Sequence, residues 1–139
     1  MRFWDASAVV ALLLDEPASI QARQWFQEDP QRLVWWATEV ECISAIGRWE
    51  REGALDLHSS SLALDRLAGL SRQWAEVQPL PMVRNLARRL LRTHPLRAAD
   101  ALQLAAALAV AEQEPSSLSF LCLDRRLSEA ANREGLRMS

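Results

Sequence analysis

The sequence predicts a three-layer α/β/α fold, in which helices cover both faces of a central parallel sheet of four to five strands. Short apolar segments alternate with longer segments of helical periodicity, which indicates a parallel sheet. The strand-like segments are continuously apolar, as in LVWW at Leu33–Trp36, a pattern typical of strands buried on both faces. No repeat or linker-like tract interrupts the 139 residues, so we expect a single domain over residues 1–139.

Start and stop signals mark the elements of the first half of the chain. Pro17 suits the first turn of a helix. Thr38 can cap another helix, with Glu41 three residues on as in a capping box and Gly53 as the C-terminal stop. The expected elements are a strand at Arg2–Trp4, helices at Ala6–Leu14 and from Pro17 toward Asp29, a strand at Leu33–Trp36, a helix at Thr38–Gly53, and a helical hairpin arm within Asp56–Glu76.

The second half of the chain contains the most apolar helix and the clearest strand. Leu96–Glu112 is apolar on nearly all sides, which indicates burial between layers. LSFLCL at Leu118–Leu123 has the composition of a buried strand. The remaining expected elements are a weak strand at Val77–Leu80, a helix from Pro81 that ends before Pro95, a helix at Arg125–Glu134 closed by Gly135, and a last strand at Leu136–Met138.

Four carboxylates are placed where such a fold binds ligands. Asp5 and Asp124 directly follow strands, and parallel strands bind ligands beyond their carboxyl ends. Glu41 and Asp100 lie near the beginnings of helices that face the same edge. Taken alone, Asp5 and Asp124 are explained slightly better as helix caps than as functional acids, and Glu41 as a capping-box member or a first-turn acid. Asp100, however, lies in an apolar helix, where a carboxylate needs a partner or a cation.

Four converging carboxylates favour a bound cation, because like charges oppose one another's ionisation. Oxygen ligands select a hard ion, which indicates Mg²⁺ with Mn²⁺ as its usual substitute. Such a site suits hydrolysis of a phosphate ester by metal-activated water. Two other phosphate-handling classes fit poorly: a receiver domain needs a lysine, of which the chain has none, and a haloacid-dehalogenase phosphatase needs Asp-x-Asp where Asp5-Ala6-Ser7 stands.

Four segments, in order, resemble the motifs of the PIN-domain ribonucleases, and within them the VapC-type toxins of type II toxin–antitoxin systems. FWDASAVVALLLDEP is similar to the opening motif, TEVECISAIGR to the second, LRAADALQLAAAL to the third and FLCLDRRLSEAANREGL to the fourth. The resemblance covers essentially the whole chain. One departure is Cys122, which stands two residues before the fourth acid where the family often has Thr or Ser.

This resemblance implies a Mg²⁺-dependent endoribonuclease with Asp5, Glu41, Asp100 and Asp124 as its catalytic acids. Asp5 and Asp100 would be the principal metal ligands, and Ser7 could orient Asp5. The family also implies a homodimer and a small cognate antitoxin protein that blocks the acidic pocket. The alternative is a catalytically silent PIN-like module that binds RNA or a protein.

Arginine supplies all the cationic side chains, and several are clustered. Between Arg66 and Arg97 there are seven Arg and a single acid, and Arg84, Arg88 and Arg92 share one helical face. This cluster favours contact with RNA phosphates or with an acidic antitoxin segment over a merely solvated face. The absence of a leader or an apolar span, and two cysteines without metal-site spacing, predict a cytoplasmic protein with no membrane contact and reduced thiols.

Overall fold

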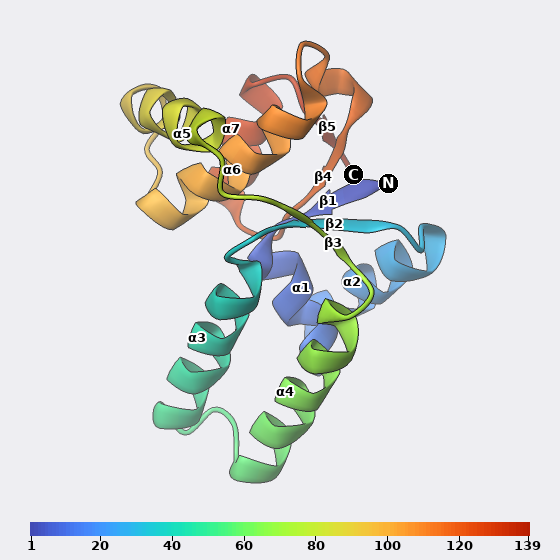
Figure 1. The fold of residues 1–139 in the computed structure, drawn as a ribbon. Helices are drawn as coiled ribbons and strands as arrows, with labels where there is room; N and C mark the ends of the chain where they lie inside the picture. Colours follow the sequence, from blue (N-terminus) through green and yellow to red (C-terminus); the bar gives the residue numbers. More distant parts are fainter.

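Five parallel strands form the centre of the protein in this computed structural model, which describes all of residues 1–139 (Figure 1). Their spatial order is β3-β2-β1-β4-β5, so the first strand of the chain lies in the middle of the sheet. The strands are β1 (Arg2–Trp4), β2 (Arg32–Trp35), β3 (Ala75–Val77), β4 (Ser119–Leu121) and β5 (Arg137–Met138). Every neighbouring pair is parallel, which confirms the predicted sheet.

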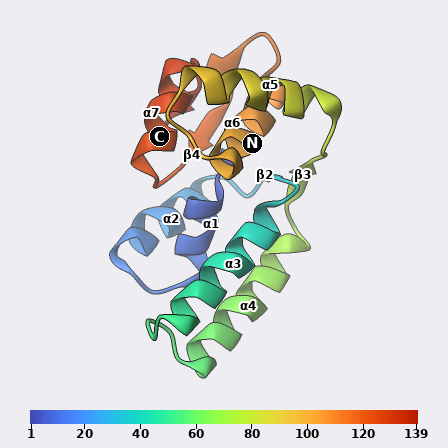
Figure 2. The same cartoon turned by 90° about the vertical axis from the view of Figure 1, so that its left-hand side faces the viewer.

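Helices cover both faces of this sheet, as predicted (Figures 1 and 2). The N-terminal helices are α1 (Ala6–Leu13), α2 (Pro17–Glu28), α3 (Thr38–Arg51) and α4 (Leu57–Ser71), and they lie on one side. The C-terminal helices α5 (Pro81–Thr93), α6 (Ala98–Ala111) and α7 (Arg125–Arg133) lie on the other. The helices α3 and α4 project together from the sheet as the expected hairpin arm. None of the helices is both long and apolar enough to cross a membrane.

Alternating side chains of the central strands divide the interior into two cores. Phe3 and Phe120 stack, with their ring centroids 5.5 Å apart, in the core beneath α5, α6 and α7. Trp4 and Leu121, one residue further along each strand, point into the core formed with α1 to α4. Successive side chains of a strand point to opposite faces, so a strand covered on both faces contributes to two cores. This geometry explains why Phe3 and Trp4, and likewise Phe120 and Leu121, are consecutive apolar residues.

The predicted boundary between α4 and the next strand was wrong. The helix ends at Ser71 rather than extending toward Glu76, and the strand occupies Ala75–Val77 rather than Val77–Leu80. Its register is fixed by pairing of Trp35 with Val77. Pro79 and Pro81 cannot donate to a sheet ladder, so the strand ends before them. As a partly exposed edge strand, β3 lacks the apolar run that marks the central strands.

Candidate functional site

The four predicted acids lie at the carboxyl edge of the sheet and influence one another electrostatically. Asp5 follows the central strand β1, and Asp124 begins α7 just beyond the adjacent strand β4. Glu41 and Asp100 come from the first turns of α3 and α6. Negative charge on Asp100 raises the pKa of both Asp5 and Glu41, and Asp124 raises that of Asp100. The fold therefore brings all four carboxyl groups into one region.

Asp5 is the most buried of these acids, with only 4% of its surface exposed. Its backbone N–H donates to the Leu121 carbonyl at 3.0 Å, which continues the β1–β4 pairing. Its Oδ2 accepts from the Ser7 backbone N–H at 3.1 Å, so the side chain caps α1. Burial raises the pKa of Asp5, although hydrogen bonds from Ser7 and Cys122 oppose this shift. Asp5 is thus a helix cap and also a buried carboxyl group, whose ionised form a nearby cation would stabilise.

Ser7 joins Asp5 to the loop that carries Asp124. Its hydroxyl donates to Asp5 Oδ2 at 2.6 Å and accepts from the Leu123 backbone N–H at 2.9 Å. Ser7 therefore orients Asp5, as the sequence suggested, and fixes the distance between two strand ends.

The thiol of Cys122 lies 3.5 Å from Asp5 Oδ2 and accepts from the Asp124 backbone N–H at 3.3 Å. Burial, reinforced by the charge of Asp5, raises the pKa of Cys122 to about 12, so the thiol keeps its proton and can donate to Asp5. The sulfur thus takes part in the contacts that hold both acids, although a thiol is a weaker partner than a hydroxyl. Both cysteines are free, as predicted.

Glu41 is held by Gln103, a residue that the sequence had not marked as part of the site. The Gln103 side chain is 1% exposed, and its Nε2 donates to both Glu41 Oε2 and the Thr38 hydroxyl, the latter at 3.0 Å. Burial raises the pKa of Glu41 to about 7, with smaller contributions from the charges of Asp5 and Asp100. Glu41 can therefore gain or lose a proton near neutral pH.

The predicted capping box at Thr38 and Glu41 was wrong. Ala37 occupies the cap position of α3, and no side chain caps the helix. Thr38 lies inside the first turn, where its hydroxyl accepts from Gln103 across the gap to α6. Both side chains contact Gln103 of α6 rather than the backbone at their own helix N-terminus. One signal could have revealed Gln103: it is the single polar residue of α6 beyond Asp100, and it stands three positions after that acid.

Asp100 and Asp124 are more open to solvent than Asp5. Asp100 lies in the apolar helix that the sequence predicted, but its side chain is only half-buried because it lies in the first turn of α6. Burial and the Asp124 charge raise the pKa of Asp100. Asp124 caps α7, its Oδ1 accepting from the Leu127 backbone N–H at 2.9 Å. None of the salt bridges in the structure involves any of the four acids.

The donor chemistry of this region fits a hard cation held by few protein ligands. No three or more His, Cys, Asp or Glu side chains are arranged so that together they could hold one metal ion. Mg²⁺ does not require such a cage, because it keeps several waters and is commonly bound by one or two carboxylates. The Oε1 atom of Gln103 is also buried without a partner, so the site has one further oxygen acceptor. The residues present therefore fit a partly hydrated ion.

Replacing Gln103 tests whether it positions Glu41. If the acids bind Mg²⁺, Gln103→Leu should weaken that binding by about 10- to 100-fold, as loss of a supporting hydrogen bond does in metal sites. The substitution removes the donor shared by Glu41 and Thr38 while keeping a similar side-chain volume. Calorimetric titration with Mg²⁺ measures the effect, and Gln113→Leu, at an exposed position just beyond α6, is the matched control. Equal affinities in the two variants would contradict the positioning role.

Comparisons with known proteins agree with this architecture. The family model for the PIN domain matches residues 2–132. Comparison with curated proteins finds no match. Among solved structures, PAE2754 from Pyrobaculum aerophilum is 21% identical, with a TM-score of 0.65 over 99% of this chain and 87% of that one. FitAcB from Neisseria gonorrhoeae is 14% identical, with a TM-score of 0.67 over 99% of this chain and 96% of that one. FitAB bound to an IR36 DNA fragment is 14% identical, with a TM-score of 0.66 and coverage of 100% and 94%.

Proposed function

Because the chain belongs to the PIN-domain family, whose members are generally nucleases, we propose that it is a Mg²⁺-dependent endoribonuclease. The observation that carries the proposal is the acidic cluster at the carboxyl edge of the sheet. The negative charges of neighbouring acids raise the pKa of Asp5, Glu41 and Asp100, and none of the four carboxyl groups has an ion-pair partner. A catalytic metal site is the simplest arrangement that makes use of such a cluster.

Asp5 and Asp100 are the proposed metal ligands. A bound divalent ion would offset the negative charge of the phosphate and make the attacking water more acidic. Ser7 and Cys122 hold Asp5 in place, and Gln103 holds Glu41. With a pKa of about 7, Glu41 can accept a proton at neutral pH, which suits it to assist the water or to complete the ligand set. Asp124 closes the cluster on the side of α7.

Exposed arginines supply the positive surface that an acidic site needs in order to bind RNA. Arg84, Arg88 and Arg92 are exposed on α5, spaced at i, i+4 and i+8, and form no salt bridge. Unpaired guanidinium groups in such a row can follow a phosphate backbone. The neighbouring Arg89 is different, because both its amino groups contact Glu134.

The same proposal makes the protein the toxin of a toxin–antitoxin pair. It rests on the ordered motifs that resemble VapC-type toxins, with support from the fold that the chain shares with FitAcB and FitAB. A small antitoxin protein that covers the acidic cluster would be the partner, and the active form would be a homodimer. Co-expression with the product of a short adjacent reading frame, followed by co-purification, tests the antitoxin.

The test of the nuclease is cleavage of RNA by the purified protein. We expect cleavage with Mg²⁺ or Mn²⁺, none after EDTA, recovery when Mg²⁺ is restored, and loss in Asp100→Asn. A silent RNA- or protein-binding module would bind RNA without cutting it under any of these conditions. Cleavage that persists in both EDTA and Asp100→Asn would exclude the proposed acidic site.

A further inference from the structure

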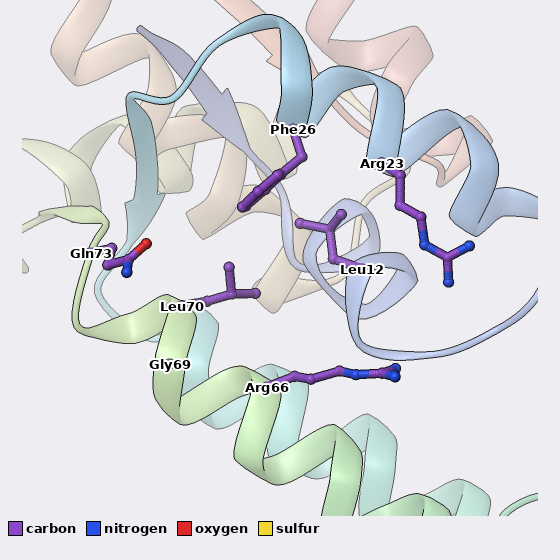
Figure 3. Close-up of a pocket in the computed structure, with 7 residues that line it drawn as sticks. All are labelled: Leu12, Arg23, Phe26, Arg66, Gly69, Leu70 and Gln73. Atoms are coloured by element: carbon purple, nitrogen blue, oxygen red, sulfur yellow. The ribbon is translucent and has the colours of Figure 1, made fainter.

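A pocket lies between α1, α2 and α4, and it is formed by none of the four acids (Figure 3). Its volume is about 350 Å³, within the range of pockets that hold small molecules. The lining residues are Leu12, Arg23, Phe26, Arg66, Gly69, Leu70 and Gln73. Three of them are apolar, two are cationic and none is acidic, so the pocket combines an apolar wall with a positive rim.

The two arginines at the rim differ in their ion-pair and hydrogen-bond partners within the protein. Arg23 forms an ion pair with Asp15, whose side chain is 75% exposed. Arg66 has no carboxylate partner; its Nη1 donates to the Leu13 carbonyl at 3.0 Å. Figure 3 shows the head groups of Arg23 and Arg66 on the same side of the pocket. The remaining N–H groups of Arg66 are therefore available to an anion.

A third cationic group, Arg32, lies behind the apolar wall. The guanidinium carbon of Arg32 is 3.6 Å from the centroid of the Phe26 ring, and Arg32 is only 9% exposed. Its Nε has no hydrogen-bond partner, and neither has Nε1 of Trp4, which is 1% exposed. Both residues line a void that shares Leu12 and Leu70 with the pocket and is too small for water. Buried unpaired donors make this region of the protein electropositive.

Gly69 keeps the pocket open. Glycine within a helix costs about 1 kcal/mol relative to alanine, and packing does not require it here. A Cβ atom built on Gly69 would meet nothing within 4 Å, because it would project into open space. A side chain at this position would occupy the pocket without disturbing the core.

We propose that this pocket binds a small amphipathic anion, whose apolar body contacts Leu12, Phe26 and Leu70 and whose carboxylate or equivalent acid group is held by Arg66. The pairing of an apolar wall with the Arg66 guanidinium, which has no carboxylate partner, selects this class over neutral apolar molecules and over cations. This site is independent of the acidic cluster, and the proposal does not rest on nuclease activity.

Titration of the purified protein with octanoate tests the proposal, with 1-octanol as the uncharged probe of similar shape. Chemical shifts of the indole N–H groups follow binding, because Trp4 and Trp74 line the adjoining void. We expect saturable binding of octanoate, at least tenfold tighter than that of octanol. Arg66→Gln, which removes the guanidinium charge, should weaken octanoate binding about tenfold or more, whereas Arg72→Gln, exposed at the end of the same helix, should leave it unchanged.

Gly69→Leu provides the second arm of the test. It should abolish octanoate binding while leaving the thermal unfolding temperature unchanged or higher. Equal binding of octanol and octanoate would overturn the proposal and indicate a groove for an apolar chain segment. Absence of octanoate binding to the natural protein, or unchanged binding in Gly69→Leu, would equally overturn it.

Discussion

Asp5→Asn is expected to reduce RNA cleavage by about 10²- to 10³-fold or more, since removal of even one neutral preorganised group from a reacting centre causes a loss of that size. Asparagine has nearly the same shape as aspartate and is as good a helix cap, so it keeps the hydrogen bond from the Ser7 backbone. What it lacks is the negative charge that would attract the metal ion. The cleavage rate at saturating Mg²⁺, measured on one RNA, reports the loss.

The same substitution should leave stability unchanged or increase it, which separates a functional role from a structural one. Burial raises the pKa of Asp5, so the ionised carboxyl group is unfavourable in the folded protein without a cation. Replacing it by a neutral amide removes that cost. A gain of about 1 kcal/mol would raise the unfolding temperature by roughly 3 °C in a domain of this size.

Asp56→Asn is the matched control for this experiment. Asp56 caps α4 by accepting from the Ser59 backbone N–H at 2.7 Å, but it is exposed and lies far from the acidic cluster in the arm. Its replacement should alter neither cleavage nor its dependence on Mg²⁺. If Asp5→Asn cleaved RNA as fast as Asp56→Asn, Asp5 would be only a helix cap.

The central strands could be predicted from sequence because burial on both faces leaves an apolar signature. Phe3 and Trp4 face opposite cores, so these two consecutive positions of β1 are both apolar. The edge strand β3 has no such requirement: Ala75 is exposed, and Glu76 accepts from the Trp74 indole N–H at 3.1 Å. Its position is set by pairing with β2, a long-range contact that local sequence does not encode.

The candidate site was predictable to the extent that it depends on topology. Asp5 and Asp124 follow adjacent parallel strands, and the rule for such sheets places them at one edge. The role of Gln103 depends instead on the rotation of α6 relative to α3, which brings its amide to both Glu41 and Thr38. Local signals assigned Thr38 to a cap because they take no account of packing between distant helices.

The ionisation of Glu41 is expected to make the stability of the protein depend on pH. Its pKa of about 7 in the folded protein lies above the ordinary value of 4.5, so between these values the folded state binds a proton that the unfolded state does not. Without metal, this contribution to stability is therefore full below pH 4.5 and is lost as the pH rises through 7. After allowance for partial exposure, we expect it to amount to ~2 kcal/mol. Denaturant unfolding at pH 5 and pH 8 measures the difference.

Glu41→Gln isolates this contribution, because the amide cannot ionise. Asp5 and Asp100 also have raised pKa values, so the natural protein and the variant should both lose stability with rising pH, and the variant should lose less. Glu39→Gln, at a partly exposed first-turn acid of the same helix, is the control and should behave like the natural protein. Identical pH dependence in Glu41→Gln and Glu39→Gln would show that Glu41 ionises normally.

Metal binding should reverse the trend, because Mg²⁺ favours the ionised carboxyl groups that high pH produces. Added Mg²⁺ is expected to raise the unfolding temperature more at pH 8 than at pH 5, and this gain should be smaller in Glu41→Gln. Cleavage should likewise increase as the pH rises through 7, since protonated Glu41 can neither bind the ion nor accept a proton. If Mg²⁺ stabilised the protein equally at both pH values, the cation would bind away from these acids, and the raised pKa values would have to be explained by burial alone.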